Sequence, residues 1–193
     1  MRTLGAVVVL SAMVAHPAAG QTAHRELGAH EHGRGTLNIA VEGNKINMEL
    51  EVSGMDIVGF EHEAKTRNDK AALEKAKQKL SAPLSLFKLP ASAGCLVTEA
   101  KVEVETGESD HPANAGEKGR APESSEKEQH HSEFHNTYSL ECTSPTSITG
   151  IEFVYFNAFP GAEKLEVNVI TPKGQNKFEV TRERPNLSLV GTI

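Results

Sequence analysis

The feature that most constrains the fold is a two-residue alternation of apolar and polar side chains along much of the chain. Residues 36–41 and 45–52 show it first, with an apolar residue at every second position. Successive side chains of a β-strand point to opposite faces of a sheet, so the alternation predicts strands with one buried face. Gly43 and Asn44 between the two segments tolerate positive φ, which predicts a tight β-hairpin.

Further strands and one helix follow from the same kind of pattern. Leu73, Ala76 and Leu80 have helical spacing, and Thr66 with Asp69 resembles a capping box before them. We expect an α+β, mostly β domain: an antiparallel sheet or sandwich of about seven strands with one amphipathic helix. The later strands are expected at residues 96–104, 138–142, 151–156, 165–169, 178–180 and 187–189.

A polar segment interrupts the strands. From Thr106 to Glu133 the chain has seven carboxylates, three basic residues and alanine as its only aliphatic type. Such a segment buries too little apolar surface to offset the entropy of ordering it. We therefore predict a disordered insert at residues 106–134, forming a long hairpin loop rich in histidine and acidic residues.

The first 20 residues have the three regions of a secretory signal. A basic start precedes the apolar run Leu4–Val14, and Ala18 and Gly20 are small residues placed for cleavage before Gln21. The apolar run is shorter than the roughly 20 residues that cross a bilayer. We expect a signal peptide at residues 1–20, a single exported domain at residues 21–193 and no membrane insertion.

Cys95 and Cys142 are the only cysteines of the chain. In an exported protein, an even pair is typical of a disulfide, and a zinc site that uses both thiolates is the alternative. The disulfide would stabilise the fold by roughly 4 kcal/mol in the chain-entropy model.

The charge of the chain selects among ligands. The net charge is −6, which disfavours nucleic acid and anionic membrane surfaces as partners and favours a cation. Imidazole and carboxylate ligands suit Zn(II) better than soft Cu(I), whereas Ni(II) and Cu(II) also bind imidazole, so the sequence leaves these three metals open.

Histidines gather in and beside the polar insert. Imidazoles among carboxylates on a pliable backbone are typical of metal binding, and a solvated polar linker is the alternative. The candidate ligands are His111, His130, His131 and His135.

A second group of candidate ligands comes from outside the insert. His30 and His32 would point to one face of an extended segment and could chelate one ion. His62, flanked by two glutamates, is a possible third ligand. If the fold brings the three together, this preformed site should bind more tightly than the insert, whose ordering costs entropy.

Signatures of catalysis are missing from the sequence. It has no glycine-rich phosphate loop, no GxSxG and no HExxH. We expect a protein that is not an enzyme. A metal-dependent hydrolase using Asp56, Glu61 and His62 is the alternative in that class.

Several of these segments together resemble a known family, the ZrgA-type (zinc-regulated) periplasmic zinc-binding proteins of Gram-negative bacteria. The resemblance implies a periplasmic protein without known catalytic activity that assists zinc acquisition alongside an importer, with metal binding in the histidine-rich insert. A structural or protein-interaction β module with a merely solvated loop is the alternative. The matching segments are GAHEHG at residues 28–33, LNIAVEG at 37–43, GMDIVGFEH at 54–62, AGC at 93–95, residues 138–142 and FPG at 159–161.

Overall fold

Two sheets of unequal size make up the protein, in a computed structural model that describes residues 31–107 and 131–193. The six-stranded sheet has the order β4 (Cys95–Gly107), β5 (His131–Cys142), β2 (Lys45–Ser53), β1 (Arg34–Glu42), β7 (Lys164–Thr171) and β8 (Gly174–Thr181). The three-stranded sheet has the order β3 (Phe87–Lys88), β6 (Gly150–Phe153) and β9 (Asn186–Ser188).

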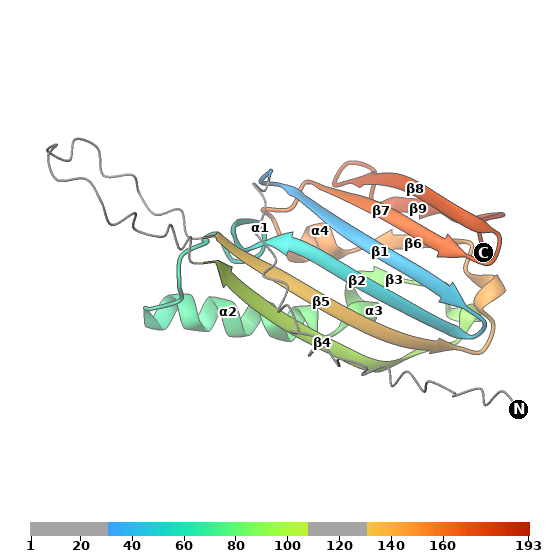
Figure 1. Cartoon of the computed structure of the whole chain (residues 1–193), viewed down its shortest axis with the longest axis horizontal. Coiled ribbons are helices and arrows are strands. Elements are labelled where there is room, and N and C mark those ends of the chain that lie inside the picture. The colour runs from blue at the N-terminus through green and yellow to red at the C-terminus, as the bar shows by residue number, and fades with distance from the viewer. Residues whose placement is uncertain (1–30, 108–130) are drawn as a thin grey trace, which may run out of the picture.

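Helices and the small sheet cover one face of the large sheet (Figure 1). The predicted α+β, mostly β class with a disulfide-closed sandwich is confirmed. The α-helices are α1 (Gly54–Val58), α2 (Arg67–Leu80), α3 (Pro83–Leu86) and α4 (Tyr155–Ala158), and short 3-10 helices span Ala91–Ala93 and Pro145–Ser147.

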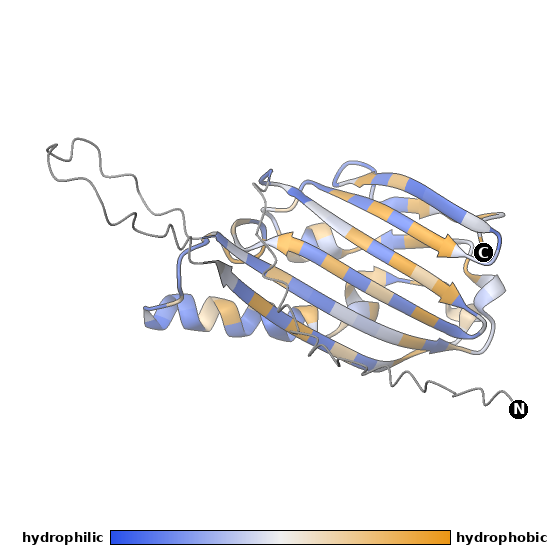
Figure 2. Cartoon of the chain, viewed as in Figure 1, coloured by the Kyte–Doolittle hydropathy of each residue, from blue (hydrophilic) through white to orange (hydrophobic). Residues whose placement is uncertain are grey.

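The core lies between the large sheet and this cover. Figure 2 shows apolar and polar residues alternating along the strands of the large sheet. In β1 and β2 the apolar positions are buried and the intervening ones are not, as the alternation predicts. The uncovered face of the large sheet is therefore mostly polar, with Ile170 of β7 as an exposed apolar exception.

The predicted hairpin and helix are both present. Glu42 pairs with Lys45 across the turn between β1 and β2. At the start of α2, the Thr66 hydroxyl accepts a hydrogen bond from the Asp69 N–H, and the Asp69 carboxylate accepts one from the Thr66 N–H. This capping box satisfies backbone donors that the first helical turn leaves free.

One strand pair of the large sheet is parallel, which the sequence pattern did not predict. β7 joins the outer edge of β1 and runs in the same direction. Parallel strands need a long crossover connection, and here the chain passes through the helices and the small sheet between β1 and β7.

The strand predicted at residues 151–156 is too long. β6 ends at Phe153, and Tyr155 begins the short helix α4. Tyr155, Phe156 and Phe159 are all buried, and the Tyr155 ring contacts the rings of both phenylalanines, because the helical turn and its C-cap keep all three side chains in the core. A strand would have pointed Tyr155 and Phe156 to opposite faces.

Both ends of the predicted disordered insert are instead strands. β4 continues through Gly107, and β5 begins at His131 and pairs with it. Ser132 and Phe134 point inward and are buried, so alternation begins earlier than the polar composition suggested. The limits 106–134 are thus too wide, and the insert's residues 108–130 lie outside the described part, as does the predicted signal peptide at residues 1–20.

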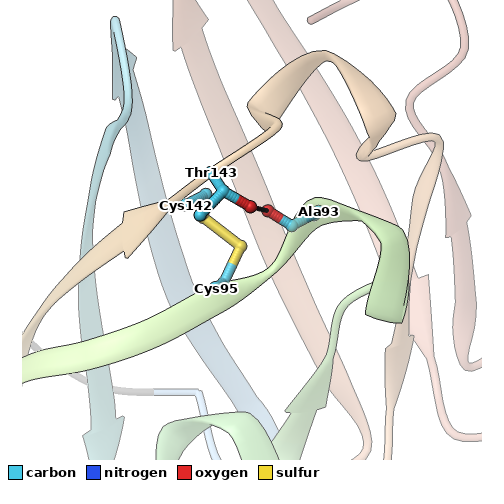
Figure 3. The surroundings of a disulfide bond; sticks show 4 residues. All are labelled: Ala93, Cys95, Cys142 and Thr143. Carbon is cyan, nitrogen blue, oxygen red and sulfur yellow. Dashed lines mark hydrogen bonds between the residues drawn. A yellow bond between two sulfur atoms is a disulfide. The ribbon is translucent and has the colours of Figure 1, made fainter.

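The predicted disulfide is present between Cys95 and Cys142, which face each other across β4 and β5 (Figure 3). Nearby, the Thr143 hydroxyl donates a hydrogen bond to the Ala93 carbonyl at 3.4 Å. The disulfide lies at the opposite end of the β4–β5 hairpin from the Gly107–His131 pair.

Within residues 31–107 and 131–193, no helix is long and apolar enough to cross a membrane.

Candidate metal centre

Three segments distant in the sequence meet beside the first residue of β5. Glu61, which follows α1, contacts one histidine on each side. Its Oε1 lies 3.3 Å from His32 Nε2, and its Oε2 lies 3.3 Å from His131 Nδ1. We call His32, Glu61 and His131 the Glu61 group.

Local structure explains why Glu61 points here. Ser53 caps α1 by accepting a hydrogen bond from the Asp56 N–H, and Gly59 ends the helix with a φ of 83°. This left-handed conformation suits glycine because it has no Cβ, and it turns the chain sharply. Residues 60 and 61 therefore return along the end of the large sheet, where β5 begins.

The Glu61 side chain is partly buried, and one of its two carboxylate oxygens is buried and unsatisfied. The side chain is only 12% exposed. Oε2 makes a hydrogen bond with His131, whereas Oε1 has no hydrogen-bond partner among the described residues, despite the nearby His32 ring. Burying a carboxylate oxygen without a hydrogen-bond donor costs free energy, so binding of a proton donor or a cation to this oxygen would be favourable.

The spacing of these atoms suits a tetrahedral metal ion. Zinc binds histidine nitrogen and carboxylate oxygen at about 2.0–2.1 Å, which places two ligands of one tetrahedral ion about 3.3 Å apart. Both nitrogen-to-oxygen distances in the Glu61 group are 3.3 Å. Each histidine could thus share an ion with Glu61 after a small rotation.

The group is not a closed site as it stands. Within the described part of the chain, no three His, Cys, Asp or Glu side chains are already arranged to hold a metal ion. The two imidazoles contact different oxygens of Glu61, so an ion bound by all three must draw them together. His32 is 56% exposed and has room to move, while Glu61 is held in place.

His62 faces a different environment. Its ring stacks on Phe60, with 4.7 Å between the ring centroids, and its Nδ1 lies 3.0 Å from the Glu63 carbonyl oxygen. None of the contacts described joins His62 to His32 or Glu61. A ligand role for His62 stays a prediction, and the geometry offers Glu61 in its place.

His135 lies within β5 rather than in a loop, surrounded by carboxylates on the uncovered face of the sheet. Its Nε2 lies 3.0 Å from Glu133 and 3.6 Å from Glu105, and its Nδ1 lies 3.6 Å from Glu51. These residues lie on the adjacent strands β2, β5 and β4. Glu51 of β2 pairs in register with His135 of β5, and Glu105 of β4 pairs with Glu133 of β5. We call these four residues the His135 group.

A surface hollow of about 380 Å³ borders this region. Its lining includes Glu31, Glu51 and Glu133, contributed by the turn before β1, by β2 and by β5. Glu51 and Glu133 belong to the His135 group, and Glu31 pairs with Arg34, which also lines the hollow. The hollow therefore lies beside the His135 group, whose carboxylates attract cations.

Of the predicted ligands, the structure brings together His32 and His131, and places His135 four residues further along β5. The candidate ligands named from the sequence for metal binding left out Glu61, which contacts both histidines, and Glu51, which lies beside His135. The available signal was alternation: once β5 starts at His131, residues 131, 133 and 135 share one face. His30, His111 and His130 lie outside the described residues.

A family model described as "ZrgA family zinc uptake protein" matches residues 29–189. The chain belongs to the ZrgA family. That match covers the described residues up to 189, including the whole of the Glu61 group and the His135 group. None of the curated proteins compared with the chain matches it.

Membership of the ZrgA family connects the chain to zinc uptake and so favours zinc among the metals that the sequence left open. Its description names no ligand residue. Any assignment of zinc ligands therefore rests on the contacts of Glu61, His32 and His131.

Proposed function

We propose that this protein captures Zn(II) in the periplasm for zinc acquisition and that the Glu61 group closes around the ion as its binding site. Glu61 supplies a partly buried carboxylate, and His32 and His131 supply imidazoles from opposite sides. The cation would satisfy the carboxylate oxygen that lacks a hydrogen-bond donor. That unsatisfied oxygen, 3.3 Å from an imidazole nitrogen, is the observation that carries the proposal.

Neighbouring histidines complete the coordination in this proposal. His30 is two residues before His32 in the sequence, and His130 immediately precedes His131, so we include both as further candidate ligands. His111 and the carboxylates of the insert raise the local zinc concentration. Tetrahedral zinc needs four ligands, of which the Glu61 group supplies three.

The His135 group assists electrostatically and offers further ligands. Glu51, Glu105 and Glu133 place negative charge around one imidazole on rigid strands. Such a cluster at the sheet end steers cations toward it and disfavours anions.

Release to an importer component is the second half of the proposed function. The insert must lose conformational entropy when it wraps an ion, which keeps its contribution to affinity modest. Modest affinity suits a protein that passes zinc on. Export by the predicted signal peptide would place the protein beside such an importer.

The test is isothermal titration of zinc into the intact protein and into Glu61→Gln. The substitution keeps the size of the side chain and removes its charge. We expect zinc affinity at the tightest site to fall at least about tenfold, or about 1.4 kcal/mol. The matched control is Glu152→Gln, which removes an exposed carboxylate of β6 that pairs with Lys88 at 3.5 Å.

Equal affinities of the parent protein, Glu61→Gln and the control would contradict the assignment. If zinc in addition left the thermal stability of the parent unchanged, the β domain would be a structural or interaction module instead.

A further inference from the structure

All three segments of the Glu61 group are fastened to the short helix α1. The turn before β1 reaches it through Asp56, the start of β5 packs against Gly54, and Glu61 follows it beyond Gly59. No charged side chain of α1 belongs to the Glu61 group itself.

Asp56 holds the turn that carries His32. The Gly33 N–H donates a hydrogen bond of 2.7 Å to Asp56 Oδ1, and this bond is buried. Gly33 follows His32 directly and has a φ of 83°, so the chain bends sharply there. The bond fixes where that bend lies relative to Glu61.

The other side of the same turn is also fixed. The Gly33 carbonyl accepts hydrogen bonds of 2.8 Å from the N–H groups of both Glu163 and Lys164. Just before them, Gly161 lies so close to α1 that a Cβ there would be 2.6 Å from the Asp56 carbonyl oxygen. Gly33 is therefore held between α1 and the start of β7.

Gly54 allows β5 to approach the same helix. A Cβ at Gly54 would overlap the Ser132 hydroxyl and would lie 2.8 Å from the Phe60 carbonyl oxygen. Ser132 follows His131, and Phe60 precedes Glu61. The absence of a side chain at Gly54 thus lets the segments that contain His131 and Glu61 both lie against α1.

Asp56, in the first turn of α1, is a carboxylate in a buried position. It is 3% exposed, and its Oδ2 has no hydrogen-bond partner among the described residues. An apolar residue would fill this place without burying a carboxylate. What Asp56 adds is a fixed acceptor for Gly33.

We propose that Asp56 is a positioning residue for zinc binding, which holds the Glu31–Arg34 turn so that His32 faces Glu61. The inference rests on the proposed function, because it assigns to Asp56 the orientation of a ligand of that site. Without the Asp56–Gly33 bond, His32 would sample many positions, and binding would have to restrict them.

The test is a double-mutant cycle between Asp56→Ala and His32→Ala in the intact protein, with zinc affinity measured by competition with a chromophoric chelator. We expect each single substitution to weaken zinc binding about tenfold. The double substitution should be no weaker than His32→Ala alone, because Asp56 acts only through His32. Asp56→Asn keeps an acceptor for Gly33 and should bind zinc within about threefold of the parent.

The outcomes separate the two claims. If His32→Ala leaves zinc affinity unchanged, the Glu61 group is not the site and the proposed function fails. If His32→Ala weakens binding but Asp56→Ala does not, or if the two effects add, the positioning role is wrong. Loss of affinity in Asp56→Asn equal to that in Asp56→Ala would also overturn it.

Folding is checked without metal by near-ultraviolet circular dichroism and thermal unfolding. Should Asp56→Ala not fold, Asp56→Leu takes its place in the cycle, since leucine has a similar branched shape and accepts no hydrogen bond. A general loss of structure would lower the melting temperature, whereas a positioning role changes zinc affinity far more than the metal-free stability.

Discussion

At the scale of single residues, the carboxylates around α1 have different surroundings. Glu61 lies between two imidazoles, whereas Asp56 is favoured as an anion by the Gly33 N–H, the Ser53 side chain and the nearby His32. Burial raises the pKa of Asp56 above its usual range, against the lowering effect of the Gly33 hydrogen bond. The ionised form of Asp56 therefore costs stability, although its acceptor atom orders the turn.

The pH dependence of unfolding tests this cost. A carboxyl with a higher pKa in the folded chain binds more protons when folded, so its contribution is largest below the unfolded pKa of about 3.9. That contribution is lost as the pH rises through the folded pKa. As the pH rises through this range, the parent should lose this contribution, whereas Asp56→Asn should not. We therefore expect the free energy of unfolding of Asp56→Asn to increase relative to that of the parent. The increase should be about 1.4 kcal/mol for each tenfold difference between the folded and unfolded acid dissociation constants. Urea unfolding of both proteins between pH 3.5 and about pH 7 measures it, and parallel curves would contradict the raised pKa.

At the scale of elements, the β4–β5 hairpin joins the disulfide at one end to His131 at the other. Local alternation was enough to predict β1, β2 and their turn, because the polarity of each side chain there indicates whether it faces the core or the solvent. Alternation gave a wrong prediction at Tyr155, where buried aromatic residues occupy a helical turn. It also gave a wrong prediction at residues 131–134, where the outward-facing polar residues of a strand were taken for part of the insert. The meeting of His32, Glu61 and His131 depends on contacts across as many as 70 residues between Glu61 and His131, which no local period reports.

Replacing both cysteines by serine should separate stability from binding. We expect a loss of about 4 kcal/mol in unfolding free energy, because the unfolded chain regains the entropy of an open loop. Zinc affinity of the folded protein should change less than about threefold, since the disulfide lies at the far end of the hairpin from His131. Urea unfolding and zinc titration on the same preparation provide both values. A tenfold loss of affinity in the folded variant would contradict this separation.

Replacing residues 108–130 with a short glycine–asparagine turn between β4 and β5 should separate the zinc binding of the insert from that of the Glu61 group. The segment contains His111 and His130, whereas His131 stays in β5. We expect fewer zinc ions per chain, with at least one ion still bound and still sensitive to Glu61→Gln. Titration calorimetry gives both numbers. Complete loss of binding would place all zinc ligands in the replaced segment.

At the scale of the whole molecule, negative charge is concentrated where the histidines are. The net charge of −6 is spread over the chain, but Glu51, Glu61, Glu105 and Glu133 all contact histidines at one end of the large sheet. The covered face supplies the core, and the open face with its turns supplies the proposed ligands. Capture of a cation at that end should therefore stabilise the whole fold.

Zinc should raise the melting temperature of the intact protein. A ligand at a hundred times its dissociation constant stabilises the folded state by about 2.7 kcal/mol, provided that it does not bind the unfolded chain. For a domain of this size that corresponds to a rise of several degrees. Differential scanning fluorimetry with zinc, and with magnesium as the control cation, measures the rise. An equal rise with magnesium would indicate general charge screening rather than a site with imidazole ligands.

The most direct measurement is anomalous diffraction at the zinc absorption edge from crystals of the zinc-loaded protein. A zinc ion about 2.0–2.1 Å from a Glu61 carboxylate oxygen and from the ring nitrogens of His32 and His131 is the predicted result. Zinc ions found only at other side chains, with the Glu61 contacts to both histidines unchanged, would contradict the account.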